Sequence, residues 1–303
     1  MNEKEMEKEF DEKRKEFLAN YKKGRTINIV IMAVLMVAYI ILLALFSSET
    51  WVLYVGFVVI IVLLMYSTIY KKRMNQRLKE YISSFYQSVT EYAWKEAGIE
   101  PYEEDFQSQL AQEDVEKALI YTNIGQMKSM NLVRFSIANE SFLSADTLIK
   151  IRTSNDEKKK STLKIAFGGK FYQSELQSMS LDANILLYKK GKYDLLVPPN
   201  DLKGMELLEE TQEDLIYVKG KIPSHIKEVL LAQWKKIVID ESTLDVSLSF
   251  HDNRLTVLFS YADKMLTIPL YEPFENMGFS AVARDLAWLK ETVEKLEEVS
   301  KKN

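Results

Sequence analysis

Residues 27–46 read INIVIMAVLMVAYIILLALF, and residues 51–70 read WVLYVGFVVIIVLLMYSTIY. Asn28 is the single polar residue of the first run, Ser67 and Thr68 are the polar residues of the second, and neither run contains a charge. A helix of about 20 apolar residues crosses the ~30 Å hydrocarbon layer of a bilayer, so each run is long enough to span it. We therefore predict a transmembrane helical hairpin over residues 26–70, with spans at 27–46 and 51–70.

The energy of membrane insertion favours this interpretation over a pair of buried core helices. The first run holds 13 Ile, Leu, Val or Phe residues, and at roughly −0.4 kcal/mol each they contribute about −5 kcal/mol to insertion. Two core helices would also have to be joined by residues 47–50 alone. Neither run contains an ionisable side chain, which favours an anchor over a channel or transporter.

The charges that flank the hairpin predict its orientation. The linking loop carries one charge, that of Glu49. Basic residues lie outside both runs: Lys22, Lys23, Arg25, Lys71, Lys72, Arg73 and Arg77. Because Lys and Arg near the ends of spans are retained in the cytoplasm, both termini are expected inside. We predict a two-span protein of the cytoplasmic membrane that contacts the lipid bilayer through residues 27–70.

Charged segments with an apolar stripe flank the hairpin on its cytoplasmic side. Apolar residues recur at helical spacing within residues 1–25, and a second stripe runs from Met74 to about Lys95, ahead of the stop signals Gly98 and Pro101. We predict that residues 1–25 form an amphipathic helix, packed antiparallel on a helical stem over residues 71–100. The alternative is that each stripe packs on the downstream domain. The residues of the first stripe are Met6, Phe10, Phe17 and Tyr21.

Residues 101–303 are expected to form a cytoplasmic domain of helices and strands. The apolar pattern predicts helices at 105–121, 224–236 and 280–299. Alternating apolar residues predict strands at 133–137, 148–151, 163–167, 185–188, 193–197, 215–218, 244–250, 255–261 and 265–270, with a solvated loop at 154–160.

Hairpins outnumber strand–helix–strand units in this pattern, so the fold class is α+β with a largely antiparallel sheet. The domain could be one unit or two lobes divided near Pro198–Gly204. The stripe of the C-terminal helix alternates steps of four and three residues, like a short coiled-coil seam. It either packs on the same chain or mediates oligomerisation. Its residues are Val282, Leu286, Leu289, Val293 and Leu296.

Composition excludes several classes of function. The chain of 303 residues has 40 Lys and Arg against 44 Asp and Glu, a formal net charge of −4, which argues against a nucleic-acid-binding protein. It has no cysteine, which excludes disulfides, Cys-ligated zinc and iron–sulfur clusters. Two histidines argue against a multi-histidine metal site. No cofactor and no metal is predicted.

The residues that invite a catalytic interpretation each have a simpler one. Gly168-Gly169-Lys170 lacks the Gly four residues ahead and the Ser or Thr after the Lys that a P-loop requires, so it predicts a turn at a strand end. Glu103-Glu104-Asp105 and Glu113-Asp114 suit the start of a helix. His225 and His251 have no partner base or nucleophile identifiable from spacing. No catalytic, cofactor-binding or metal-binding residue is predicted.

Four short segments carry a resemblance to a known family. They are Phe167-Gly168-Gly169-Lys170-Phe171, Leu215-Ile216-Tyr217-Val218, the helix that begins at Pro223, and Asn253-Arg254-Leu255-Thr256-Val257. With the hairpin, they resemble an uncharacterised bacterial membrane-protein family, a domain of unknown function with two N-terminal transmembrane helices and a β-rich cytoplasmic domain, sometimes encoded near LemA-like proteins. The resemblance covers most of the chain and implies a fold and a membrane location, but no catalytic residues.

The absence of a catalytic constellation favours one function. We predict a membrane-anchored cytoplasmic scaffold or adaptor that binds a protein partner or associates with itself. An enzyme of unrecognised type, acting at the cytoplasmic face of the membrane, is the alternative. A pore-forming oligomer is a third hypothesis.

Overall fold

A computed structural model describes residues 3–46, 49, 51–105, 108–118, 120–121, 124–154, 161–177, 183–189, 205–211, 214–261 and 279–301. The chain divides into two compact units, which are described separately. The first unit comprises residues 1–85 and 269–275, and the second comprises residues 86–268 and 276–303. The fold is α+β, as the sequence predicts.

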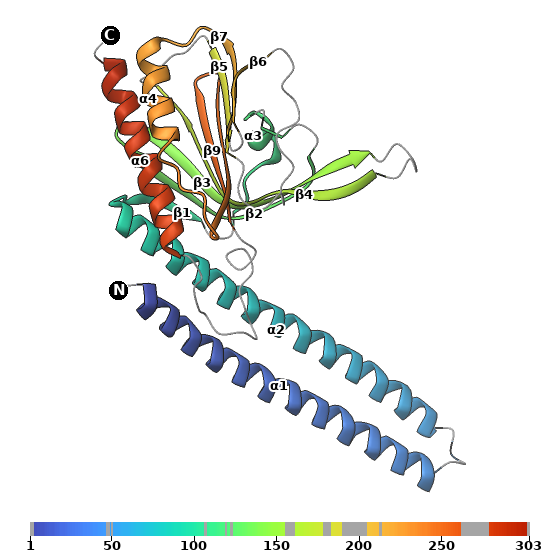
Figure 1. Cartoon of the computed structure of the whole chain (residues 1–303). Helices are drawn as coiled ribbons and strands as arrows, with labels where there is room; N and C mark the ends of the chain where they lie inside the picture. Colours follow the sequence, from blue (N-terminus) through green and yellow to red (C-terminus); the bar gives the residue numbers. More distant parts are fainter. Residues whose placement is uncertain are drawn as a thin grey trace. The chain divides into compact units, whose positions relative to one another are not determined.

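Two long helices make up the described part of the first unit. Helix α1 extends from Glu3 to Leu45, and α2 from Trp51 to Ala97, its residues up to Phe85 belonging to this unit. They run antiparallel (Figure 1). No proline precedes residue 101, so nothing interrupts either helix where charged residues give way to apolar ones. Each helix therefore includes a predicted span and a charged segment.

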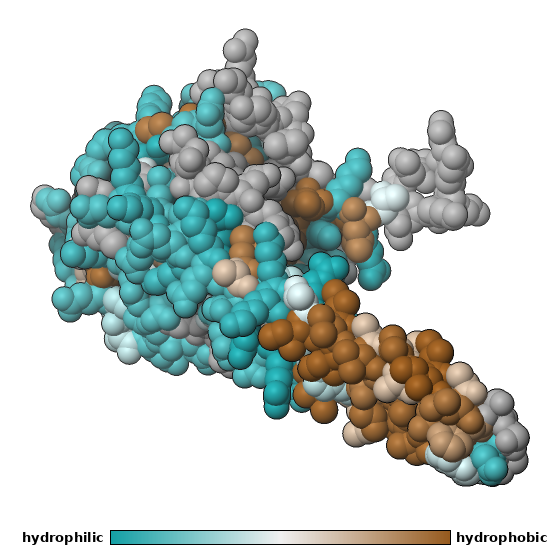
Figure 2. Space-filling model, turned by 90° about the horizontal axis from the view of Figure 1, so that it is seen from below, coloured by the Kyte–Doolittle hydropathy of each residue, from teal (hydrophilic) through white to brown (hydrophobic). Residues whose placement is uncertain are grey.

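The apolar side chains of the predicted spans face outward. Val34, Phe57 and Leu64 are 60%, 66% and 64% exposed, and Figure 2 shows a continuous apolar surface over this part of the hairpin. Both helices are long and apolar enough to cross a membrane. An apolar surface of this kind is unfavourable in water, and lipid would cover it.

The second unit is built on one antiparallel sheet with the strand order β1-β2-β3-β4-β9-β8-β5-β7-β6. The strands are β1 Pro101–Asp105, β2 Ile124–Ile137, β3 Glu140–Ser154, β4 Ser161–Glu175, β5 Ala183–Lys189, β6 Glu206–Glu210, β7 Asp214–Gly220, β8 Thr243–His251 and β9 Arg254–Tyr261. The helices are α3 Gln112–Glu116, α4 Ser224–Trp234 and α6 Phe279–Lys301, together with the end of α2. Strands from both sides of residues 198–204 belong to this sheet.

Apolar side chains cover both faces of the sheet. On one face, α4, α6 (Figure 1) and the last turns of α2 pack on the strands, and this core includes Trp94, Trp234 and Phe259. All five residues of the C-terminal stripe are buried in the same core, so the stripe packs on its own chain and is not open to a second helix. On the other face, the segment that carries α3 covers Phe171 and Leu186.

The predicted helix at 105–121 is wrong. Residues 101–105 form strand β1, and among the described residues of the segment the helix is limited to residues 112–116. The segment is tied to the sheet by the backbone N–H of Leu110, which donates to Ser129 Oγ at 2.7 Å, and by Tyr121 Oη, which donates to the Ala166 carbonyl at 3.0 Å. The apolar residues of this segment therefore pack on the sheet, although their spacing fits a helix.

The other helix predictions, and most of the strand predictions, are confirmed with shifted bounds. Helix α2 ends before Gly98, which adopts a left-handed φ of +62°, as a C-terminal glycine does. Strands β8 and β9 form the predicted hairpin, whose turn residues Asp252 and Asn253 both have positive φ. The predicted strands at 193–197 and 265–270 and most of the loop at 154–160 lie outside the described residues.

Gly168-Gly169-Lys170 is not a turn at a strand end. The three residues lie inside β4, paired with β3 and β9. A Cβ on Gly169 would lie 1.9 Å from the carbonyl oxygen of Phe259. Glycine is needed here because β9 approaches too closely for any side chain.

The two edge strands of the sheet are acidic. β1 presents Glu103, Glu104 and Asp105, and β6 presents Glu206, Glu209 and Glu210. All six residues are exposed. Charged side chains on edge strands disfavour pairing with the edge of another sheet.

Candidate membrane anchor and interfacial groove

Aromatic contacts hold the charged ends of α1 and α2 together. Phe10 meets Phe85 edge to face, with ring centroids 4.9 Å apart, and Phe17 stacks on Tyr81 at 4.8 Å. These rings come from the two stripes seen in the sequence. The contacts form the antiparallel stem that those stripes predict.

Single glycines face tyrosines across the hairpin. A Cβ on Gly24 of α1 would lie 3.4 Å from Tyr70 Oη of α2, and a Cβ on Gly56 of α2 would lie 1.9 Å from Tyr39 Oη of α1. Each glycine thus leaves room for a ring from the opposite helix. The sequence lacks a pair of glycines at helical spacing that would indicate close packing, so these contacts had no signal in it.

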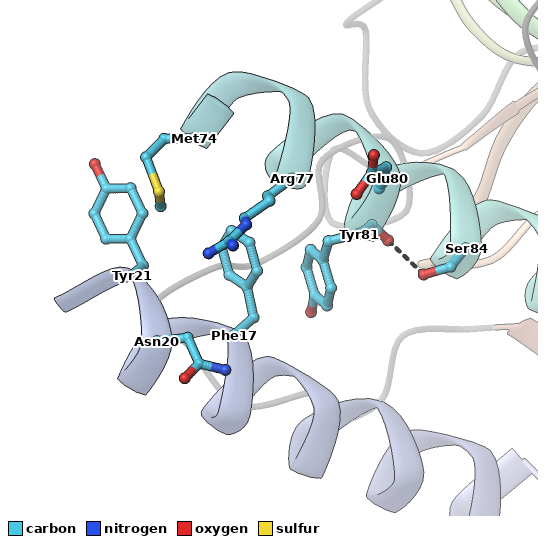
Figure 3. Close-up of a pocket in the computed structure, with 8 residues that line it drawn as sticks. All are labelled: Phe17, Asn20, Tyr21, Met74, Arg77, Glu80, Tyr81 and Ser84. Atoms are coloured by element: carbon cyan, nitrogen blue, oxygen red, sulfur yellow. Dashed lines mark hydrogen bonds between the residues drawn. The ribbon is translucent and has the colours of Figure 1, made fainter. Parts of the chain in front are cut away.

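A groove of about 590 Å³ lies between the two helices, just beyond the predicted spans. In Figure 3, aromatic side chains of α1 face an arginine, a methionine and a tyrosine of α2. It is a shallow surface groove of mixed polarity, not an enclosed cavity. Its lining residues are Phe17, Asn20 and Tyr21 of α1, and Met74, Arg77, Glu80, Tyr81 and Ser84 of α2.

Arg77 and Tyr81 are two groove residues whose side-chain polar atoms have no hydrogen-bond partner among the described residues. Arg77 is exposed and makes no ion pair or hydrogen bond with the described residues. Tyr81 Oη is buried and also lacks a hydrogen-bond partner. Burial raises the pKa of Tyr81 to about 12, so the hydroxyl remains protonated at neutral pH. Glu80, in contrast, accepts a hydrogen bond from Gln76 Nε2 at 3.1 Å.

Basic side chains are exposed on both helices next to the groove. They are Lys22, Lys23 and Arg25 of α1 and Lys71, Lys72 and Arg73 of α2. Exposed cations at the end of a span attract anionic lipid headgroups. The stem, the groove and these basic residues therefore form the candidate functional site of the hairpin unit.

Lys170 has a structural role that the sequence did not indicate. Its Nζ lies 2.8 Å from Asp146 Oδ1 and donates to Thr90 Oγ1 of α2 at 3.2 Å. Asp146 also accepts a hydrogen bond from Asn131 Nδ2 at 2.6 Å. The hydrogen bond to Thr90 fastens the end of α2 to the sheet. Lys170 is 4% exposed, so its ammonium offers no open phosphate site.

A second buried polar cluster joins α6 to the sheet. Arg284 forms ion pairs with Asp240 at 2.5 Å and with Asp285 at 3.2 Å. Thr243 Oγ1 donates to Asp285 Oδ2 at 2.8 Å. Burial raises the pKa of Asp285 to about 6, while the Arg284 charge opposes that rise. The cluster orients α6 on the sheet.

The remaining residues considered for chemistry are dispersed. His251 Nδ1 lies 2.7 Å from Asn184 Oδ1, at the end of β8, and His225 lies in the first turn of α4. Glu103 pairs with Arg134 at 3.3 Å, and Glu113 is exposed on α3. Among the described residues, no three His, Asp or Glu side chains are placed to hold a metal ion.

Comparisons with known proteins show no family for this chain. No protein-family model and no curated protein matches the chain. Among solved structures, the chain is similar to the crystal structure of the mycobacterial trehalose monomycolate transport factor A, TtfA. The sequence identity is 10% and the TM-score 0.31, over 68% of this chain and 95% of that one. A likeness this weak supports no conclusion about function, and the sequence resemblance to the LemA-associated family stays a prediction.

Proposed function

We propose that the protein is a membrane-anchored scaffold or adaptor, whose hairpin spans the cytoplasmic membrane with both termini in the cytoplasm. The observation that carries the proposal is the outward-facing apolar surface of residues 27–46 and 51–70. Exposure of that surface to water is energetically unfavourable, and a lipid bilayer would bury it.

The anchor is continuous with the sheet unit. Helix α2 begins in a predicted span at Trp51, and its last turns contribute Ala93 and Trp94 to the core of the second unit. A helix shared by the anchor and the domain suits a scaffold, which must keep a binding surface near the membrane.

The exposed apolar residues of β4 are the best candidates for that binding surface. Leu163 and Ile165 are 50% and 46% exposed and lie on one face of the strand, because alternate residues of a strand share a face. Paired exposed aliphatic side chains are typical of protein contacts. We propose that they contact a protein partner or a second copy of the chain.

Single cysteines test the topology, because the chain has no cysteine of its own. Glu49→Cys places a thiol in the linking loop, while Lys4→Cys and Lys301→Cys place one near each end. A membrane-impermeant maleimide should label intact cells only through Glu49→Cys, and label the other two after permeabilisation. Labelling of either terminal cysteine from outside, or recovery of the full chain in the supernatant without detergent, would contradict the proposal.

Cross-linking in cells followed by purification in detergent tests partner binding. We expect a reproducible partner or a dimer, lost in Leu163→Arg and retained in Lys164→Gln, which alters an exposed neighbour on the other face of β4. Reproducible absence of both a partner and self-association would overturn the scaffold proposal. Loss in both variants would place the contact elsewhere on the strand.

A further inference from the structure

The groove between α1 and α2 begins where the predicted spans end. Tyr21 lies six residues before Ile27, and Met74 lies four residues after Tyr70. At 1.5 Å per residue, these positions are about 9 Å and 6 Å beyond the spans. The headgroup layer of one leaflet is about 5–7 Å thick. When the hairpin spans a bilayer, the near end of the groove therefore lies level with the lipid headgroups.

Arg77 provides a charge suited to a phosphate. It lies about 10 Å along the helix from Tyr70, and its side chain extends from α2 toward α1 (Figure 3). A guanidinium is weakly hydrated and binds phosphate oxygens through two parallel hydrogen bonds. Because Arg77 has no partner among the described residues, a ligand would not have to displace one of these.

The rest of the groove suits a ligand that is part polar and part hydrocarbon. Met74 and Tyr21 line its end near the membrane, and Phe17 stacked on Tyr81 lines the far end. Glu80 is the acidic lining residue, but it is one turn farther from the span than Arg77 and is bonded to Gln76. The exposed basic residues around the groove would enrich anionic lipids at this depth.

We propose that the groove holds one anionic phospholipid of the cytoplasmic leaflet, drawn partly out of the leaflet so that its headgroup phosphate contacts Arg77 and its glycerol ester region contacts Met74 and Tyr21. The proposal rests on the membrane anchoring proposed above, because the depth of the groove is counted from the spans. It goes beyond anchoring by assigning a selective lipid site. A lipid wedged between the helices would also stabilise the stem.

Native mass spectrometry of the full chain, released from micelles containing equal amounts of phosphatidylglycerol and phosphatidylcholine, tests the site. Arg77→Gln removes the guanidinium that is proposed to bind the lipid phosphate. Arg73→Gln is the matched control, because it removes the same group closer to the span without altering a groove residue. Asn20→Trp fills the groove and leaves Arg77 in place. Inorganic phosphate added in excess separates a lipid site from a site for free phosphate.

We expect the wild type to retain phosphatidylglycerol selectively, because the choline cation of phosphatidylcholine offsets the charge of its phosphate. Arg77→Gln should lower the amount of bound phosphatidylglycerol about tenfold, the usual size of one lost charged hydrogen bond. Asn20→Trp should lower that amount similarly, and Arg73→Gln much less. Equal loss in Arg73→Gln and Arg77→Gln, no selectivity in the wild type, or displacement by inorganic phosphate would overturn the proposal. If the site fails while the cysteine labelling succeeds, the anchor stands without it.

Discussion

The two units of the chain place the same kinds of side chain in opposite ways. In the hairpin, Val34 and Phe57 are 60% and 66% exposed, whereas Val257 and Phe259 in the sheet are 0% exposed. The sheet shields its apolar side chains from water by turning them inward, whereas the hairpin turns them outward, where only lipid or another apolar partner would shield them. The exposed fraction of an apolar side chain therefore indicates its contribution to stability only when the surrounding medium, water or lipid, is known.

The largest contrast is expected between two phenylalanines. Phe259→Ala, in the core of the sheet, should lower the free energy of unfolding by about 3–5 kcal/mol, because it leaves a cavity beside Tyr172 and Trp288. Phe57→Ala, which faces outward in the second span, should change it by less than about 1 kcal/mol. Chemical denaturation of both variants in detergent measures the two effects. Similar losses would mean that Phe57 packs on protein.

An added charge should cost more in the hairpin than in the sheet unit. Val37 and Leu163 are 54% and 50% exposed, so an arginine would cost about the same at both positions if water surrounded both. Val37→Arg should cost about 3 kcal/mol of membrane insertion, seen as loss of the chain from the membrane fraction. Leu163→Arg should change stability by about 0.5 kcal/mol or less. Normal insertion of Val37→Arg would contradict the assignment of the span.

A pH effect is expected from one buried carboxyl of the sheet unit, that of Asp285. The folded state holds the pKa of Asp285 at about 6 against an ordinary value of 3.8, so the favourable contribution is complete below pH 4 and is lost as the pH rises through 6. The loss is about 3 kcal/mol, at 1.36 kcal/mol for each pKa unit.

Asp285→Asn removes this titration. The difference in unfolding free energy between the wild type and Asp285→Asn should therefore change by about 3 kcal/mol between pH 4 and pH 7. Glu294→Gln, an exposed acid on the same helix, controls for the loss of a carboxylate. A difference that stays constant with pH would show that Asp285 does not titrate in this range.

The smallest effect is expected in the stem. Phe17→Leu keeps an apolar side chain but removes the ring stacked on Tyr81, which should cost about 1 kcal/mol. Limited proteolysis of the N-terminal helix should become measurably faster. Glu16→Gln, an exposed neighbour, should leave the rate unchanged. An unchanged rate in Phe17→Leu would mean that the rings add nothing to the stem.

Features with a strong local signal were predictable from the sequence. Two helices long and apolar enough to span a membrane follow from the length of two uncharged runs, and the β8–β9 hairpin follows from strict alternation around Asp252 and Asn253. The order of strands in the sheet was not predictable. Strand β4 pairs with β9, where Gly169 lies opposite Ser260, and local pattern says nothing about partners so far apart in the chain.

Helix periodicity misled where tertiary contacts decide the structure. Leu110, Val115 and Ala118 fit one helical face, yet they cover the sheet from a segment with a five-residue helix. The groove was also missed, because it depends on how α1 and α2 align. A signal was present: Arg77 lies three residues after Met74 and four before Tyr81, which puts a cation within an apolar stripe.

In a membrane-anchored protein, the acidic edges of the sheet would limit association between neighbouring copies. Confinement to a surface makes neighbouring copies collide more often than they would in solution. Two sheets approaching edge to edge would bring rows of carboxylates from β1 or β6 together, and like charges directly opposite each other repel. Crowded copies would thus be kept from polymerising through their strands, and any self-association would have to use another surface.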